Sequence, residues 1–298
     1  MRAVAVLASY NEERFIANCL EHLFRHGFEV YLIDNCSTDR TVAIADGYRG
    51  RGLIDIETFH REEGVEPLFI PLMRRKEEVI ATLDADWFLH ADLDEVRLPP
   101  RSGITLADAL ADVDAQGYNA VNFMEFTFIP TREAPDHDHP DYLRTMRWYY
   151  PYAPRYPNRL NAWKRQSGPV ELASSGGHLV RFPNLRMYPE SFPMRHYQIL
   201  GVKHLLGKYG PHRYPPAHLM QGRYGWRARI DPMQAQFPSQ TELREYTSDD
   251  ELDDSNPRMV HYAAQFPQVQ PTTYQKALFR VSNMRTWLGR KAGSGSAP

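Results

Sequence analysis

Residues 81–95 read ATLDADWFLHADLDE and contain the pattern Asp-x-Asp twice, on either side of a short apolar segment. The apolar segment, residues 87–91, has the composition of a buried strand. The first acidic pair, Asp84 and Asp86, precedes this strand, and the second pair, Asp92 and Asp94, follows it. The two pairs are therefore expected at opposite ends of one strand.

The chain before this stretch alternates between strand-like and helix-like segments. Apolar runs predict strands at residues 2–8, 28–33, 53–59 and 87–91. Apolar residues at helical spacing predict helices between them, with Asn11 as the first N-cap, Ser37 or Thr38 as the second, and a third helix over 67–82. This alternation predicts an α/β fold with a Rossmann-like parallel sheet and helices on both faces.

The pattern weakens in the second half of the chain. Helices are predicted at 106–113 and 198–209, strands at 120–129, 160–164 and 178–182, and a helix-like segment at 274–288. Residues 130–157 are rich in Pro, Tyr, Arg, Asp and His and lack periodicity, which favours an ordered loop or flap over a site. Residues 289–298 have the composition of a disordered linker.

Composition limits the choice of partners and compartment. A net charge of −2 over 298 residues makes nucleic acid an unlikely partner. Cys19 and Cys36 are the only cysteines, which argues against a disulfide framework or zinc knuckle and favours a reducing, cytoplasmic location. The N-terminal apolar run is too short for a signal peptide, and no apolar run is long enough to span a membrane.

Strand direction distinguishes the two acidic pairs. Ligands of a parallel sheet bind at the carboxyl ends of the strands, where Asp92, Asp94 and the adjacent Glu95 are expected. Clustered acids repel one another unless a cation compensates them, and carboxylate oxygens suit Mg²⁺ or Mn²⁺. The pattern alone is weak, because loop acids are usually only solvated. Asp84 and Asp86 are interpreted as a helix-to-strand connection.

Polar side chains also follow the other strands. Tyr10, Asn11 and Glu12 come after the first strand, and Asp34 ends the second. Such groups can stack on a nucleobase and accept hydrogen bonds from the base and ribose. No Gly-x-Gly-x-x-Gly and no Walker lysine motif is present, which disfavours a dinucleotide site or a P-loop.

These motifs together resemble a known family. The segments LASYNEERFIANCLEHLFRHGFEVYLIDNCSTDRT, residues 7–41, and DWFLHADLDEVRLPP, residues 86–100, resemble nucleotide-sugar-dependent glycosyltransferases of the GT-A fold. They are most similar to the family-2-like group, including the branch related to family 92. The resemblance covers the first hundred or so residues well. It implies metal-dependent transfer of a sugar from a nucleoside diphosphate sugar, UDP-type by expectation, to an acceptor hydroxyl with inversion.

The resemblance also assigns roles to individual residues. The nucleotide-binding positions it implies are Ala8, Tyr10, Glu12, Asp34, Arg74 (or Arg75 or Lys76), Asp92 and Lys203. The metal ligands it implies for Mn²⁺ or Mg²⁺ are Asp92, Asp94 and His196. His178 and then His261 are alternative histidines, and a purely structural role for His196 stays open. A solvated helix face stays open for each of the three basic residues.

The catalytic base departs from the family pattern. The common form places an acidic pair after a Gly-Gly segment, whereas Gly176 and Gly177 are followed here by His178. The base candidates are therefore Glu125, Glu171 and His178, each with an alternative as a surface or supporting group.

The resemblance divides the chain into four parts. Residues 1–128 are the expected nucleotide-sugar-binding half, 129–210 the acceptor-side half, 211–288 a C-terminal extension and 289–298 a tail. Three rival functions remain: a nucleotidyltransferase, a non-catalytic nucleotide-sugar-binding protein, and a nucleic-acid-modifying glycosyltransferase that uses the basic residues of 144–165.

Overall fold

The computed structural model describes residues 1–60, 69–209 and 225–269. The predicted helix-like segment 274–288 and the tail 289–298 lie outside the described residues, as does the beginning of the expected C-terminal extension.

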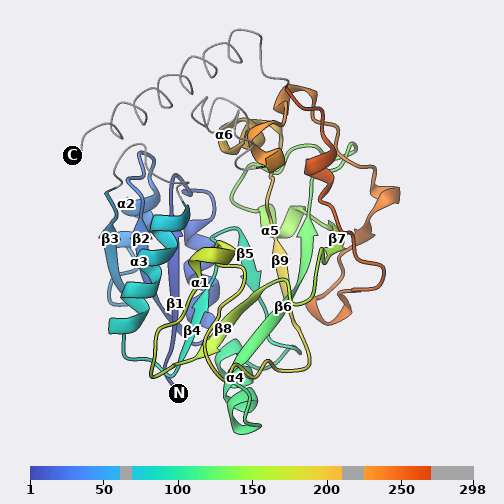
Figure 1. Cartoon of the computed structure of the whole chain (residues 1–298). Coiled ribbons are helices and arrows are strands. Elements are labelled where there is room, and N and C mark those ends of the chain that lie inside the picture. The colour runs from blue at the N-terminus through green and yellow to red at the C-terminus, as the bar shows by residue number, and fades with distance from the viewer. Residues whose placement is uncertain (61–68, 210–224, 270–298) are drawn as a thin grey trace, which may run out of the picture.

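The N-terminal half is a parallel sheet with crossover helices (Figure 1). Its strands are β1 (Ala3–Ser9), β2 (Phe28–Asp34), β3 (Leu53–Thr58) and β4 (Trp87–His90), in the order β3-β2-β1-β4. They are connected by α1 (Ile16–Arg25), α2 (Thr41–Asp46) and α3 (Phe69–Thr82). The predicted α/β class with a central, mostly parallel sheet is confirmed.

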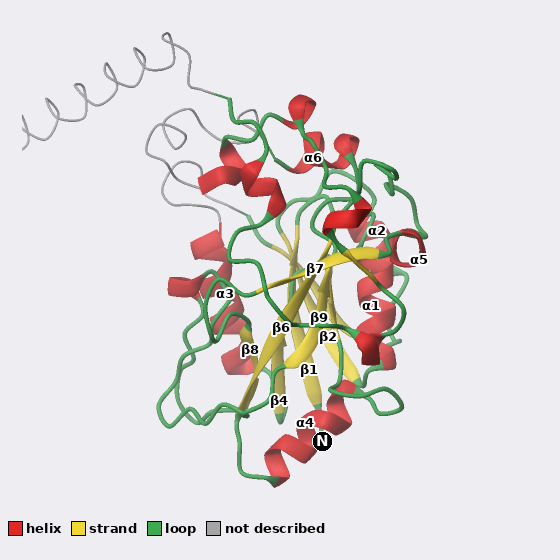
Figure 2. Cartoon of the chain, turned by 90° about the vertical axis from the view of Figure 1, so that its right-hand side faces the viewer, coloured by secondary structure: helices red, strands yellow, loops and turns green. Residues whose placement is uncertain are grey.

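Helices cover both faces of this sheet, as Figure 2 shows for α1 and α3. Side chains of β1 alternate between two hydrophobic clusters, because successive residues of a strand point to opposite faces. Ala3, Ala5 and Leu7 pack in the cluster that includes α1 and α4 (Leu106–Ala115). Val4 and Val6 pack in the cluster that includes α3. Burial on both faces explains why β1 is a continuous apolar run.

The sheet continues into the second half of the chain. β6 (Ala120–Phe128) pairs antiparallel with β8 (Leu160–Lys164) and β7 (Trp148–Tyr152), and parallel with β9 (Phe192–His196). β8 pairs with β4, β9 pairs with β5 (Glu95–Arg97), and the short β10 (Arg244–Glu245) pairs with β7. One sheet therefore spans the two halves expected on either side of residue 128.

The remaining elements are short and lie mostly at one end of the sheet. The helices are α5 (Tyr142–Thr145) and α6 (Val202–Lys208), and the 3-10 turns are η1 (Ala173–Ser175), η3 (Gly225–Ala228), η4 (Pro232–Gln234), η5 (Gln240–Glu242), η6 (Asp249–Glu251) and η7 (Tyr262–Gln265). Part of residues 225–269 packs in a third cluster with β7 and α6, through side chains such as Tyr150, Leu205 and Ile230. This C-terminal segment therefore adjoins the same sheet.

Several predicted elements differ from the structure. Residues 130–157 are not only loop, because β7 belongs to the sheet; its Tyr149 and Tyr150 are both buried, so the strand shows no alternation. Residues 178–182 form only isolated bridges, and α6 begins at Val202 rather than 198. Asn11 caps no helix: its φ is 58°, and its side chain accepts from the Thr38 amide at 2.7 Å.

Among the described residues, the helices are all too short or too polar to reach across a lipid bilayer.

Candidate active site

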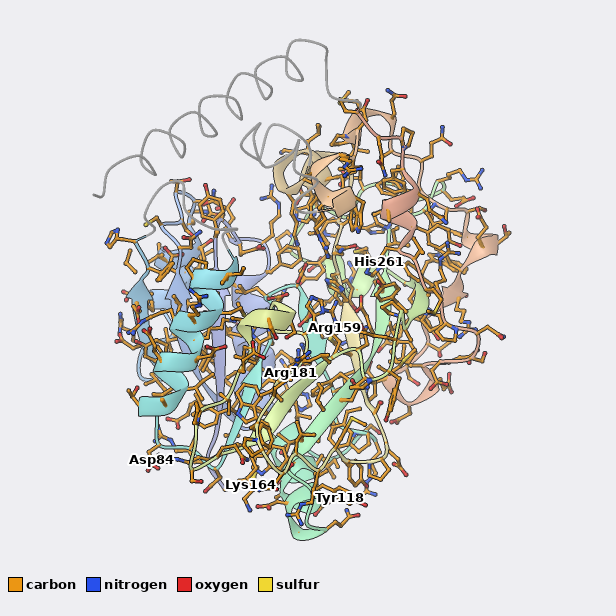
Figure 3. The ribbon with its side chains drawn as sticks, viewed as in Figure 1. Asp84, Tyr118, Arg159, Lys164, Arg181 and His261 are labelled. Atoms are coloured by element: carbon orange, nitrogen blue, oxygen red, sulfur yellow. The ribbon has the colours of Figure 1, made fainter. Side chains whose placement is uncertain are left out.

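The first acidic pair stabilises the amino end of the sheet. Asp84 Oδ1 lies 2.5 Å from Arg165 Nη1, and the Arg2 amide donates to Asp86 Oδ2 at 2.6 Å. Figure 3 shows Asp84 at the lower edge of the molecule and Arg159 nearer its centre. These contacts fit the expected role as a helix-to-strand connection.

The second acidic pair lies at the carboxyl end of β4. Asp92 is open to solvent, whereas Asp94 is buried. The carboxylate of Asp94 contacts Lys208 Nζ at 2.6 Å and lies 3.5 Å from His196 Nε2. The Asp92 amide donates to Glu95 Oε2 at 3.0 Å. The loop between β4 and β5 thus presents one free and one paired carboxylate.

These carboxyl groups perturb one another's pKa. The surrounding protein, followed by Glu95 and Asp94, raises the pKa of Asp92 above its ordinary value, although its side chain remains open to solvent. Burial raises the pKa of Glu12 to about 7; Lys208 opposes this rise, and Asp94 and Asp92 add to it. Burial also disfavours ionisation of Asp94, but Lys208 and His196 outweigh burial and lower its pKa. Asp92 and Glu12 therefore ionise less readily than ordinary carboxyl groups, because neighbouring cations do not fully offset burial and the adjacent acids.

His196 is held between two acids. The register of β5 and β9 places it opposite Glu95, and its Nδ1 lies 2.7 Å from Glu125 Oε1. Burial opposes protonation of the ring, but Glu125 and Asp94 raise the pKa of His196 to about 10. The Glu125 contact at Nδ1 turns Nε2 toward Asp94. The raised pKa makes the ring an imidazolium, so Nε2 would bind a metal only after it loses its proton.

Glu125 is enclosed by its partners. It is fully buried, and its carboxylate accepts from Arg159 Nη2 at 2.8 Å, Arg159 Nε at 3.0 Å and Thr127 Oγ1 at 2.9 Å. Burial disfavours its charge, but Arg159 and His196 outweigh burial and hold the pKa of Glu125 well below its ordinary value. A carboxylate so bonded organises Arg159 and His196 and has little capacity to accept a substrate proton.

Of the three basic residues predicted on α3, Lys76 reaches the acidic loop. It is fully buried, its Nζ lies 2.9 Å from His90 Nδ1, and burial lowers its pKa to about 8 against the opposing charges of Asp92 and Glu95. Arg74 is exposed on the same helix, and Arg75 pairs with Glu57 at 2.7 Å.

The expected nucleotide positions Ala8, Tyr10 and Asp34 lie where β1 and β2 end. Asp34 is buried and accepts from Ser9 Oγ and the Ser37 amide, each at 2.8 Å. Tyr10 is 40% exposed, so its ring is accessible to a planar ligand. Asp34 therefore stabilises the loop after β2. It also lies at the carboxyl end of that strand, where the nucleotide is expected to bind.

Lys203, the expected diphosphate contact, and Lys208 both lie on α6 but differ in their surroundings. Lys203 is exposed, whereas Lys208 at the end of that helix is half-buried and contacts Asp94. The approach of α6 to the β4–β5 loop depends on tertiary packing, so no local pattern indicated Lys208.

A cavity of about 370 Å³ adjoins the charged cluster, and it separates the base candidates. His178 lines the cavity together with Arg159, whose guanidinium contacts the His178 ring. Glu171 lies elsewhere: it accepts from the Ser174 amide at 2.5 Å and lies 3.9 Å from Arg181. His261, the third-ranked histidine, also lines the cavity and is stacked on Tyr152 with centroids 3.6 Å apart.

The carboxylates and the imidazole at the end of β4 are ligand types that suit a hard divalent cation. Within the described residues, however, no three acids, histidines or cysteines are arranged around a common metal position. Asp92 is open and only partly compensated, and His196 presents Nε2 toward Asp94. Lys208 is the group that pairs with Asp94. A cation can therefore bind Asp92 directly, but must share Asp94 with Lys208 or displace it.

Comparison with known proteins bears on the first third of the chain. Residues 4–100 match the model of glycosyl transferase family 2. The chain is 26% identical over 121 residues to the poly(ribitol-phosphate) beta-N-acetylglucosaminyltransferase TarS of Staphylococcus aureus. This match covers 38% of the chain and 19% of TarS, so the chain spans only a small part of that relative. The resemblance to a family-2-like glycosyltransferase is confirmed over this region of the chain.

Solved structures with similar folds include two glycosyltransferases. S. aureus TarS 1–349 in complex with UDP has a TM-score of 0.44 and 16% identity, covering 66% of this chain and 60% of that one. Mannosyltransferase PcManGT from Pyrobaculum calidifontis, in complex with GDP-Man and Mn²⁺, has a TM-score of 0.41 and 17% identity, covering 74% and 62%.

Proposed function

We propose that this glycosyltransferase uses a UDP-type sugar donor and a divalent cation held by Asp92 and Asp94 to glycosylate an acceptor hydroxyl. The observation that carries the proposal is the geometry at the end of β4: an open carboxylate, a buried one, and a histidine turned toward the latter by Glu125. The choice of UDP rests on the family resemblance.

The protein's own cations prepare this end of the sheet for a diphosphate. Lys76 and Lys208 reach the acidic loop from α3 and α6, and Arg159 approaches from the start of β8. Fixed positive charges stabilise the negative charge that develops on a leaving diphosphate. A bound divalent ion would add Lewis-acid neutralisation of the same oxygens.

Nucleobase and ribose are assigned to the edge formed by Ala8, Tyr10 and Asp34. The exposed Tyr10 ring offers a stacking face, and Glu12 offers a half-buried acceptor for hydroxyl groups. This assignment puts the anomeric carbon between the nucleotide edge and the cavity.

Of the three base candidates, His178 is retained because it lines the cavity. Burial and the nearby Arg159 and Arg227 hold the pKa of His178 well below its ordinary value. The ring is therefore neutral, as a base requires, although the same charges weaken its basicity. An inverting transfer would use it to remove the acceptor proton, and His178→Gln should then lower kcat while UDP binding persists.

A thermal-shift panel tests the proposal with UDP and GDP, each with and without Mn²⁺. Binding stabilises the folded chain by mass action, by about 2.7 kcal/mol at a ligand concentration 100 times Kd. We expect UDP with Mn²⁺ to raise Tm most, Asp94→Asn to abolish the metal-dependent part, and Asp84→Asn to retain it. The proposal fails if no nucleotide shifts Tm or if Asp94→Asn keeps the full metal-dependent shift.

A further inference from the structure

The cavity beside Arg159 is strongly basic. Its described lining includes Arg155, Arg159 and Arg227 and two histidines, and contains no Asp or Glu. Its volume of about 370 Å³ falls at the lower end of the range for small-molecule sites. A cavity with this charge favours an anionic occupant.

The three arginines differ in how they are neutralised. Arg159 lines the cavity but is buried and is paired with Glu125 at 2.8 Å. Arg155 is exposed and Arg227 half-buried, and neither forms an ion pair within the part of the chain that the structure describes. Arg227 lies over the ring of Trp226, 4.9 Å from its centroid. Two guanidinium groups therefore remain available to a ligand.

These charges converge although they come from separate segments. Arg155 follows β7, Arg159 precedes β8, and Arg227 lies in η3. All three line the cavity together with His178, and all three contribute to lowering the pKa of that histidine, behind the larger effect of burial. Arg159 and His261, labelled in Figure 3, line the same cavity despite their separation in sequence.

The cavity also has an aromatic wall. Tyr152 and Trp226 line it, and both are half-buried, so part of each ring is accessible. The Tyr152 ring is fixed by its stack on His261, which itself lies 2.9 Å from Tyr150 Oη. Flat apolar faces beside polar groups suit the faces of a polyhydroxylated molecule.

The geometry points to a binding site for a phosphorylated polyol or sugar acceptor, its phosphate held by Arg155 and Arg227 and its carbon chain against Trp226 and Tyr152. Guanidinium groups match phosphate oxygens in bidentate geometry, which suits them to this role. The inference rests on the proposed function for its choice of acceptor over another ligand.

The donor diphosphate is a poorer match for this cavity. The nucleotide edge of β1 and β2 and the acidic loop after β4 lie in the N-terminal half, where Lys76 and Lys208 provide positive charge. The cavity is built by β7, the segments flanking β8 and the C-terminal segment. Arg159 lies between the two regions, 3.9 Å from Glu95 and in contact with Glu125. The cavity therefore serves a second anion.

Calorimetric titration of the full chain with glycerol 3-phosphate, in the presence of Mn²⁺ and UDP, tests the site. Glycerol at the same concentration and NaCl at the same ionic strength are the ligand controls. We expect saturable binding of glycerol 3-phosphate, no binding of glycerol, and at least ten-fold weaker binding in Arg155→Ala/Arg227→Ala. Arg181→Ala, which removes an exposed arginine outside the cavity, is the matched control and should bind like the wild type.

A second measurement separates this inference from the proposed function. UDP with Mn²⁺ should raise the Tm of the double variant as much as that of the wild type, which also shows that the variant is folded. Binding of glycerol 3-phosphate that survives in the double variant, or no saturable binding to the wild type, overturns the acceptor site. A third outcome is that UDP does not raise the Tm of the wild type, while glycerol 3-phosphate still binds and its binding depends on both arginines. That outcome overturns the glycosyltransferase proposal and leaves only a phosphate-binding site.

Discussion

Replacing Glu125 by Gln distinguishes an organising carboxylate from a catalytic base. The side chain is fully buried and contacts Arg159 twice, His196 and Thr127. The amide keeps the shape of the side chain but removes the carboxylate that Arg159 and His196 share, which leaves Glu95 at 3.9 Å from Arg159 and Asp94 at 3.5 Å from His196. Removal of one partner from a buried ion pair costs about 3–5 kcal/mol. At roughly 2–4 °C per kcal/mol for a chain of this order of size, Glu125→Gln should lower Tm by about 10 °C.

Differential scanning fluorimetry and urea denaturation measure this change, and UDP release from a sugar donor measures activity. Glu171→Gln is the matched control, because Glu171 is partly exposed and bonds mainly to its neighbour Ser174. It should shift Tm only slightly. A Glu125→Gln variant with unchanged Tm but no turnover would refute the organising role and restore Glu125 as the base.

Three further substitutions test the fold around the site. Asp84→Asn should change the unfolding free energy by less than about 1 kcal/mol and leave activity intact, since its ion pair is exposed; loss of turnover would contradict this. Burial lowers the pKa of His22 to about 3, so the unfolded chain binds more protons between pH 6.5 and 3 and stability falls as pH drops through that window. His22→Gln should remove about 2 kcal/mol of the loss between pH 7 and 5 in urea titrations, and an unchanged slope would refute the assignment. Gly177 has a φ of +86°, and a Cβ at this position would lie 2.1 Å from His90 Nε2. Gly177→Ala should therefore destabilise the chain by roughly 1–3 kcal/mol in the same titrations. Gly168→Ala is the control and should not destabilise it, because the space around Gly168 is open.

The parts of the fold that sequence predicted are those set by local periodicity. β1 and β4 are buried on both faces and therefore appear as apolar runs, and strand direction placed Asp92 and Asp84 at opposite ends of β4. β7 was missed because its tyrosines and proline follow no alternation. β5 was not predicted, because a strand of three residues is too short to show an alternation of apolar and polar residues.

Within the site, the residues that directly follow a predicted strand were predicted best. Asp92 and Asp94 follow a strong strand signal, but Arg159, Lys208 and His261 come from segments joined to them only by tertiary packing. Lys203 was predicted from the family resemblance, and Lys208 was not considered. The burial of Glu125 under Arg159 depends on the pairing of β6 with its neighbouring strands, which no local pattern specifies.

Direct measurement of Mn²⁺ binding tests the central claim. Electron paramagnetic resonance of free Mn²⁺ gives the bound fraction when the ion is titrated into the full chain with and without UDP. We predict one UDP-dependent Mn²⁺ site per chain, lost in Asp94→Asn and retained in Asp84→Asn. Equal UDP-dependent binding in the wild type and Asp94→Asn would contradict the assignment of the metal and diphosphate to the carboxyl end of β4.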